Sequence, residues 1–502
     1  MLVLIPILLT LMVLGGAMNQ NHFSMRMRIV LVILSCAVLA LVWFASQMEA
    51  PLNQFYDYDK PNAIDGRSRE FVPAAPIETE PEVIFYQGMS GYNTTRIPAL
   101  VHHQDIFFAF AEARRDTFED IGEMEIIMRR GVRRDWKVTW GSIQVLARKA
   151  GYRMMNPVPI VDTTIDMIAL IFNAHPSWVS QWDEMAAGKF QTNLMVIKSF
   201  DLGETWTDPQ EMNKETLEMM KPTVSLYAPG PGHGIQTKSG RLIVPGNYFV
   251  RTYSSEQKEF SNGTINQANV IYSDDHGRTW RPGGSINYGE HQASSDAIHS
   301  NEATIVEIED EQLCLNARTL HPDQPRVLSF SRDEGLTFGT GQLAWALEEP
   351  GYYPEVNYTM NEVPKLHEDN FTKPANAAGC QGSMIGFPAP HHLSASKTWV
   401  VFSNPASPKF RQNMAVRISQ DGCRTWSKPW TIHANASAYS DLAYFETWDA
   451  EADVHSPNIA ILFEGGKGME FPYETIRFKM FSLERMLQGL GLSTKSNVIR
   501  KG

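Results

Sequence analysis

The sequence predicts an all-β protein, a propeller that is preceded by a hydrophobic N-terminal segment. The pattern Ser-x-Asp-x-Gly-x-Thr-aromatic occurs at residues 199–206, 273–280 and 331–338, and in altered form at 419–426. Short apolar runs bounded by turn residues surround these copies, as is typical of strands. No long amphipathic helical pattern interrupts residues 82–485. Together, the repeat and the short strands favour a propeller over a helical or mixed fold.

The repeated octapeptide has the chemistry of a turn. An Asp side chain accepts hydrogen bonds from backbone N–H groups two residues on, and Gly adopts the positive φ that such a turn needs. Thr suits the strand that follows, and the aromatic ring packs beneath the loop. The fourth copy, "SQDGCRTW", is a weaker match because Cys423 stands at the glycine position. No copy continues into the acidic run and terminal Glu of a calcium-binding EF-hand loop. The four aspartates are Asp201, Asp275, Asp333 and Asp421.

The spacing of the copies indicates blades. They lie 58 to 88 residues apart, which is too far for a solenoid repeat and suits propeller blades with inserted loops. Because the repeat is continuous, residues 82–490 are assigned to one domain, although length alone would favour two or three. Residues 491–502 form a C-terminal tail. The expected strands include "DIFFAFAEA", "NLMVIKSF", "GRLIVPGNYFV", "NVIYSDD", "TWVVFSN" and "IAILFEG".

Residues 1–45 are a hydrophobic anchor or signal region. They contain two uncharged apolar runs, each near the lower length limit for crossing a bilayer. Arg26 and Arg28 precede the second run, 29–45, a pattern that keeps this flank in the cytoplasm and places the following domain outside. We expect an uncleaved signal-anchor. A cleaved signal peptide and a translation start at Met25 remain open.

The segment after the anchor supports the same topology. Residues 46–81 contain five prolines and are expected to form an extended stalk. The domain would then be lumenal or extracellular, in the lysosome, the Golgi or at the cell surface, and could be a glycoprotein. The Asn-x-Ser/Thr sequons are Asn93, Asn262, Asn357, Asn370 and Asn435.

Composition and motifs exclude several classes of function. The net charge of −12 argues against a nucleic-acid partner, despite three Arg-Arg pairs. No metal-ligand, P-loop or dinucleotide pattern occurs, so we expect neither a metal nor another cofactor. Cys36 lies in the anchor, and Cys314, Cys380 and Cys423 allow at most one disulfide, too few for a disulfide scaffold.

Nine further motifs carry a family resemblance. In chain order they are "RIPAL", "FAFAEAR", "IMRRG", "RMMNP", "APGPGHGIQ", "LNAR", "GCQGS", "FSNPASPKFR" and "AYSDL". With the Asp-box repeats, they make residues 83–480 resemble the animal sialidases, or neuraminidases. The resemblance implies a six-bladed propeller that acts as a retaining exo-α-sialidase without a cofactor. Its substrates would be sialylated glycoproteins, oligosaccharides or gangliosides, as in carbohydrate metabolism and ganglioside catabolism.

The resemblance assigns three arginines to the substrate carboxylate: Arg96 in "TRIP", Arg318 in "LNAR" and Arg411 in "KFR". Sialic acid carries this carboxylate on its anomeric carbon, and the planar, permanently charged guanidinium pairs with it through two hydrogen bonds. The family also has supporting positions that contact the carboxylate, acetamido or glycerol groups. These match Arg114, Met155 and Asn156.

The same carboxylate explains the nucleophile that the family uses. A carboxylate nucleophile would be repelled there, so a neutral tyrosine attacks, and sialidases are an exception to the two-carboxylate scheme of glycosidases. The tyrosine matches Tyr439 in "SAYSDL", and the glutamate that takes its proton matches Glu302 in "SNEATIVEI". Glu307 is a competing acid, but strand alternation places it on the opposite face.

The third catalytic group is an aspartate on the loop after "AEAR", which protonates the leaving oxygen and later activates water. Asp116, Glu119 and Asp120 lie on this loop. Eight residues separate Asp120 from Arg129, which is the family spacing, whereas counting forward from the preceding motif selects Glu119. We therefore assign the role to Asp120.

Two other functions stay open. One is a catalytically silent receptor that binds sialic acid on the same propeller. Asp120, Glu302 and Tyr439 together argue against it, because binding needs only the arginines. The other is a trans-sialidase, which would transfer the sugar to an acceptor instead of water.

Overall fold

The computed structural model describes residues 76–179, 190–221, 223–254, 259–286, 300–319, 324–351, 379–390, 396–449 and 454–492. The predicted anchor, all of the stalk before residue 76 and residues 493–502 lie outside these ranges. A search of the described residues finds no helix with the length and apolar character that a membrane crossing requires. The prediction of an N-terminal anchor is therefore not tested by the structure.

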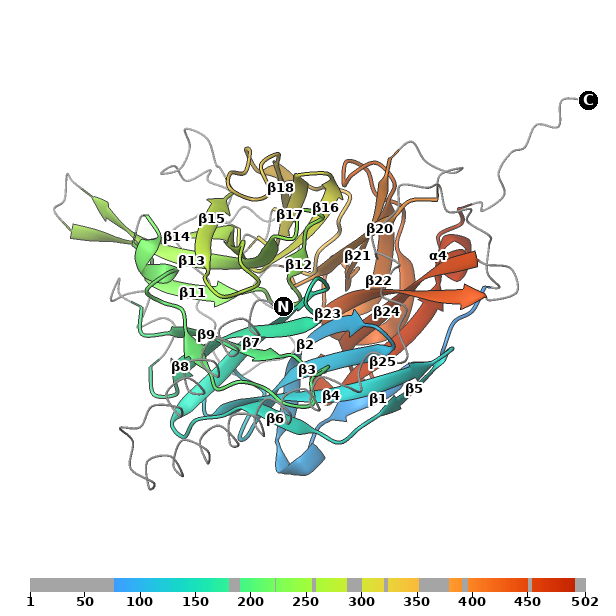
Figure 1. Ribbon diagram of the computed structural model, residues 1–502, viewed down its shortest axis with the longest axis horizontal. Helices are drawn as coiled ribbons and strands as arrows, with labels where there is room; N and C mark the ends of the chain where they lie inside the picture. The colour runs from blue at the N-terminus through green and yellow to red at the C-terminus, as the bar shows by residue number, and fades with distance from the viewer. Residues whose placement is uncertain are drawn as a thin grey trace, which may run out of the picture. The chain divides into compact units, whose positions relative to one another are not determined.

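Nearly all of the regular secondary structure in the described residues is β-strand (Figure 1). The first two groups are β2 Thr94–His103, β3 Ile106–Arg114, β4 Met124–Arg134, β5 Lys137–Trp140 and β6 Gln144–Ala147, then β7 Tyr152–Asp162, β8 Met167–Pro176, β9 Asn193–Ser199 and β10 Gln210–Glu211. The third and fourth are β11 Leu226–Pro229, β12 Ile235–Gln236, β13 Leu242–Ser254, β14 Glu259–Ser273 and β15 Arg281–Ser285, then β16 Ala303–Glu309, β17 Gln312–Ala317, β18 Val327–Ser331 and β19 Gln342–Leu343. The last two are β20 Ser383–Pro388, β21 Thr398–Pro405, β22 Gln412–Ser419 and β23 Trp430–Asp449, then β24 Val454–Gly465, β25 Thr475–Ser482 and β1 Glu82–Tyr86. The helices are short: η1 Met89–Gly91, η2 Leu217–Met219, η4 Pro472–Glu474 and α4 Leu483–Gly489.

These strands form four sheets, two of which are composite. A single parallel residue pair, Met124 with Arg153, joins β4 to β7 within a nine-stranded sheet. In a seven-stranded sheet the long β23 pairs with β22 through its first part and with β24 from Ser437 onward. Divided at these two joints, the described strands make six antiparallel groups.

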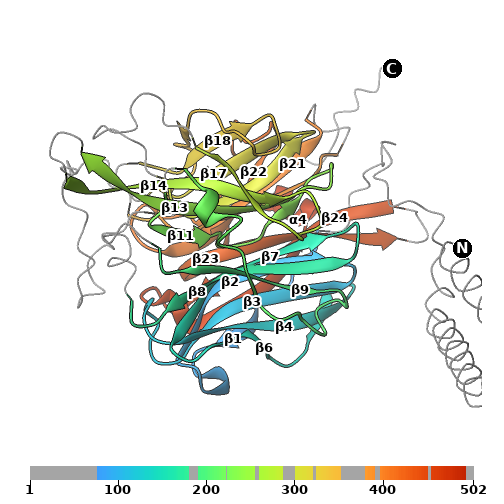
Figure 2. The same ribbon diagram turned by 60° about the vertical axis from the view of Figure 1, so that its left-hand side comes forward.

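The six groups contact one another in chain order and close into a ring (Figures 1 and 2). Strand β2 of the first group contacts β7 of the second and β23, whose second part, from Ser437 onward, belongs with β24 to the last group. Strand β1 pairs with β25, so the start and the end of the described chain complete one group together. Six hydrophobic clusters of described residues fill the spaces between neighbouring groups.

Ring packing explains the uninterrupted apolar runs of the sequence. In β3, Phe107 and Ala109 face the cluster shared with the last group, while Phe108 and Phe110 face the cluster shared with the second group. All four side chains are fully buried. A strand in a group that is packed between two neighbouring groups buries both of its faces. It is therefore apolar at every position and not only at alternate ones.

All four Asp-box copies form the same turn, including the altered one. Asp421 accepts the backbone N–H of Thr425 at 2.9 Å and its hydroxyl at 2.6 Å, and Asp201, Asp275 and Asp333 bind their threonines in the same way. These partners lie four residues on, not two as we expected. Cys423 has a φ of 67° and takes the left-handed conformation that glycine takes in the other three copies. The three described cysteines, Cys314, Cys380 and Cys423, are buried free thiols.

The fourth Asp-box turn should contribute as much to stability as a regular one. Replacing Asp421 by Ala removes three hydrogen bonds to a carboxylate, from Thr425 and Ser419, and should lower the free energy of unfolding by about 1–3 kcal/mol. Asp275→Ala should have a similar effect, measured as the shift of the urea unfolding midpoint. Asp274→Ala is the control, since Asp274 makes only a surface ion pair with Arg241 and should cost less than about 1 kcal/mol. A loss for Asp421→Ala no larger than this control would contradict the equivalence of the turns.

Candidate active site

The predicted site residues come together at one end of the ring. Antiparallel strands alternate in direction, so the start of β2, the end of β3 and the start of β4 share one end of a group. The Asp-box turns follow β9, β14, β18 and β22. Each of these is the third strand in the hydrogen-bonded order of its group, so the turns lie at the opposite end. The predicted residues are Arg96 near the start of β2, Arg114 at the end of β3, Asp120 on the loop before β4, Met155 and Asn156 in β7, Glu302 just before β16, Arg318 just after β17, Arg411 just before β22 and Tyr439 in β23.

Tyr439 and Glu302 are in direct contact. The Tyr439 hydroxyl donates a hydrogen bond to the Glu302 carboxylate. The Arg318 guanidinium donates to the other carboxylate oxygen at 2.8 Å and lies 3.4 Å from the Tyr439 oxygen. Burial, and then the Glu302 charge, raise the pKa of Tyr439 well above its ordinary value. In this state the tyrosine is neutral, and its proton already points at a base.

Three guanidinium groups surround this pair. Besides Arg318, the guanidinium carbons of Arg96 and Arg411 lie 5.4 and 5.6 Å from the centre of the Tyr439 ring. Tyr473 helps to hold them: its ring lies 4.0 Å from the Arg96 guanidinium carbon, and its hydroxyl accepts a hydrogen bond from Arg411 at 3.0 Å. Three cations that converge on one point form a site for an anion.

Glu464 fixes both Arg96 and the strand that carries Tyr439, and sequence analysis missed it. Its buried carboxylate accepts hydrogen bonds from the Arg96 side chain at 3.2 Å, from the Ile97 N–H at 3.0 Å and from the Tyr439 N–H at 3.0 Å. Burial lowers the pKa of Arg96, but the Glu464 charge outweighs this and the pKa is raised. The available signal was an acid at the end of the apolar run "IAILFEG".

Glu112 plays the same part on the other side of the site and was also missed. It is fully buried in β3 and binds the Arg114 guanidinium at 2.6 Å. It also accepts the backbone N–H of Asn156 at 2.7 Å, and Asn156 has a left-handed φ of 56°. Met155 is buried beside Asn156. An acid inside the otherwise apolar stretch "FFAFAEAR" was the available signal.

Asp120 is the acid of its loop that pairs with the site arginines. Its carboxylate lies 2.8 Å from Arg114 and 3.8 Å from Arg96, and 57% of its side chain stays exposed. Desolvation would raise the pKa of Asp120, but the charges of Arg114 and Arg96 outweigh it and hold the pKa below its usual value. The competing Glu307 accepts the Lys238 N–H at 3.0 Å, near the other end of the strands.

The comparisons with known proteins agree with this geometry. The family model described as a BNR repeat-like domain matches residues 105–455. Mouse Sialidase-3 is 30% identical over 80% of this chain and 94% of its own length, and human Sialidase-4 is 28% identical over 84% and 96%. The chain belongs to the animal sialidase family. Because this is a family of glycoside hydrolases, the protein is classed as an exo-sialidase, and the prediction from the motifs is confirmed.

Solved structures similar to this sialidase show the same fold. A Hadza microbial sialidase superposes with a TM-score of 0.58 at 20% identity, over 83% of this chain and 71% of that one. The intramolecular trans-sialidase of Ruminococcus gnavus, solved with oseltamivir carboxylate, gives a TM-score of 0.55 at 17% identity, over 80% and 97%. These likenesses confirm an all-β fold of the propeller type.

A buried imidazole–carboxylate pair joins several groups of the sialidase near the site. Asp441 in β23 accepts hydrogen bonds from the Leu100 N–H at 2.7 Å, the Ser383 hydroxyl at 2.6 Å and His233 Nδ1 at 2.8 Å. Burial lowers the pKa of His233, but the Asp441 charge and hydrogen bond outweigh it, so the pKa is raised above 6.5. Among the described residues, no cluster of His, Cys, Asp and Glu could hold a metal ion.

This pair should make the stability of the sialidase depend on pH. A raised pKa in the folded state means that protonated His233 stabilises the fold fully below about pH 6.5, its unfolded value, and that this contribution is lost as the pH rises through the folded pKa. The thermal midpoint of the wild type should therefore fall between pH 6 and 9 by more than that of His233→Gln. Parallel profiles for the two proteins would show that folding does not raise the pKa of His233.

Proposed function

We propose that this sialidase is a membrane-anchored, retaining exo-α-sialidase that uses Tyr439 as its nucleophile. It would release terminal sialic acid from glycoproteins, oligosaccharides or gangliosides. The observation that carries the proposal is the hydrogen bond from Tyr439 to Glu302, enclosed by three arginines. We further propose that the six antiparallel groups are the six blades of the propeller.

The arginines would bind and orient the substrate. Arg96 and Arg411 lie over the Tyr439 ring and Arg318 lies beside its hydroxyl, and a carboxylate on the anomeric carbon would accept hydrogen bonds from all three. This binding mode would bring the anomeric carbon against the tyrosine oxygen. The supporting residues Arg114, Met155 and Asn156 would contact the rest of the sugar.

Tyr439 would attack the anomeric carbon while Glu302 takes its proton, and a covalent sialyl-tyrosine forms. Asp120 would donate a proton to the leaving oxygen and then activate the water that resolves the intermediate. Two displacements at one carbon restore its configuration. In the free protein Arg114 and Arg96 keep Asp120 ionised. A bound substrate carboxylate would offset their charge, raise the pKa of Asp120 and so favour the protonated acid that the first step needs.

Two alternatives lead to different observations. A silent receptor would bind sialic acid and release none, and it would have no use for the contact between Tyr439 and Glu302. A trans-sialidase would give a sialylated product when an acceptor sugar is supplied. Release of free sialic acid by the purified chain, in the presence of an acceptor, separates all three functions.

The nucleophile can be tested by trapping the intermediate. A substrate with fluorine beside the anomeric carbon and a good leaving group should leave its sugar on the peptide that contains Tyr439, detected by mass spectrometry. The unmodified enzyme should release the α-anomer first, as seen by NMR. Tyr439→Phe should fold normally and lose roughly 10²–10⁴-fold in turnover, the scale of one positioned catalytic group.

Tyr444→Phe is the matched control for this variant. Tyr444 lies on the same strand and donates a hydrogen bond to Glu446 at 2.7 Å, so its loss should leave turnover nearly unchanged. Label on a different peptide would assign the nucleophile elsewhere. Release of the β-anomer first would refute a covalent mechanism.

We also propose that residues 1–45 anchor the sialidase so that its propeller faces the lumen or the cell exterior. The support is the apolar run 29–45 with Arg26 and Arg28 before it. Protein made in animal cells should migrate faster after enzymatic removal of N-glycans, because Asn93 is an exposed sequon. A variant with Gln at all five sequons should show no shift. An unshifted wild type that is also digested by protease from the cytosolic side would reverse the topology.

A further inference from the structure

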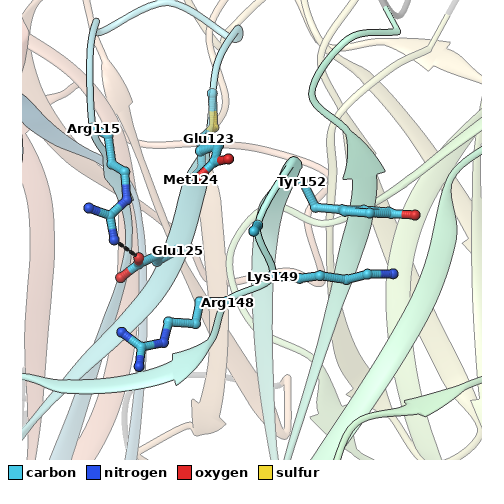
Figure 3. A pocket seen from close by; sticks show the side chains of 8 residues that line it. Arg115, Glu123, Met124, Glu125, Arg148, Lys149 and Tyr152 are labelled. Carbon is cyan, nitrogen blue, oxygen red and sulfur yellow. Dashed lines mark hydrogen bonds and ion pairs between the residues drawn. The ribbon is translucent and has the colours of Figure 1, made fainter.

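A cavity, separate from the cluster around Tyr439, lies beside the loop that carries Asp120 (Figure 3). Its volume is about 300 Å³. Arg115 and Glu123, at the two ends of this loop, form one side, and Lys149, between β6 and β7, and Tyr152, at the start of β7, form the other. Arg114 and Arg115 are consecutive residues, and Arg114 is buried against Asp120 whereas Arg115 lines the cavity. One short loop therefore borders both the active site and this cavity.

An exposed aromatic surface stands next to the cavity. The Trp178 ring packs edge-on against the Tyr152 ring, with centroids 5.8 Å apart, and 70% of Trp178 is exposed. Trp178 also covers Gly151, where an added Cβ would come within 3.2 Å of the ring. An exposed indole beside polar groups offers an apolar face to the C–H face of a sugar ring.

The cavity wall is held in place by its own contacts. Glu123 accepts the Gly151 N–H at 2.7 Å and so links the loop to the aromatic residues. The Lys149 ammonium lies 3.7 Å from the centre of the Tyr152 ring. A wall that is already ordered loses little conformational entropy when a ligand binds.

The charge of the cavity favours an acidic ligand. The Glu125 carboxylate is paired with Arg115 and accepts the Tyr92 hydroxyl, and Glu123 is bound to a backbone N–H. Arg148 and Lys149 are exposed. No ion pair within the described ranges involves either cation, so both can contact a carboxylate of the ligand.

We propose that this cavity is a subsite for the part of the substrate that leaves, and that it selects glycans in which a second acidic sugar follows the cleaved one. The proposal rests on the proposed function, because Asp120 protonates the leaving oxygen and the leaving group must then pass beside its loop. Trp178 and Tyr152 would pack on a sugar ring, while Arg148 and Lys149 bind the second carboxylate.

The test compares three substrates on the full-length chain: a small fluorogenic aryl sialoside, a monosialyl oligosaccharide and a disialyl oligosaccharide. Trp178→Ala should lower kcat/KM about tenfold for both oligosaccharides, mainly through KM, and leave the aryl sialoside unchanged. Trp178→Phe should recover part of this loss. Arg148→Gln should lower kcat/KM for the disialyl substrate alone. Trp448→Ala is the control, since Trp448 is 60% exposed but lies near the far end of β23.

Two outcomes would overturn the subsite. One is an unchanged kcat/KM for all three substrates in both Trp178→Ala and Arg148→Gln, and the other is an equal loss for all three. A separate measurement uses the Tyr439→Phe background, which should not turn the ligand over: calorimetry should show that the disialyl oligosaccharide binds Tyr439→Phe about tenfold more tightly than the double variant that also carries Arg148→Gln. Binding that changes in this way, together with no hydrolysis by the wild type, would refute the proposed function and keep the subsite. Normal hydrolysis by the wild type, together with disialyl binding that Arg148→Gln leaves unchanged, would refute the subsite and keep the proposed function.

Discussion

A buried carboxylate must be satisfied by hydrogen bonds and positive charge, and the candidate site is built around one such group, Glu464. Its two oxygens hold the Arg96 side chain and the backbone of Ile97 in the first group of strands, and the backbone of Tyr439 in the last. The same contact therefore joins the first group to the last and sets Tyr439 beside an arginine. Loss of this carboxylate would leave the Arg96 side chain and the Tyr439 backbone without the group that holds them in position.

The same arrangement recurs around the ring. Glu112 binds Arg114 and the backbone of Asn156, and so connects the first group to the second. Asp441 binds backbone, hydroxyl and imidazole donors from three other groups. Each carboxylate is buried, and each holds residues from different groups. The side chains that would contact the sugar are thus supported by rigid strands, which is the condition for preorganised binding of a charged substrate.

The strongest repeat in the sequence lies at the end of the fold away from the chemistry. Each Asp-box turn follows a third strand, whereas Arg96, Arg114 and Tyr439 belong to the opposite end of the ring. The turns can therefore conserve one local geometry in every copy while the residues at the other end differ from group to group. Cys423 illustrates this tolerance, since the turn forms with a cysteine in the left-handed conformation.

The sequence by itself determined the features that depend on neighbouring residues: the strands, from apolar runs; the four turns, from a repeated octapeptide; and the arginines, the tyrosine and the glutamate, from motifs matched to a family. Only the tertiary structure decided that Asp120, among the acids of its loop, pairs with Arg114, and that Glu464 lies beneath Arg96. The Glu464 contact could not be predicted because it joins residues 368 positions apart. Its geometry exists only once the last group of strands has packed against the first.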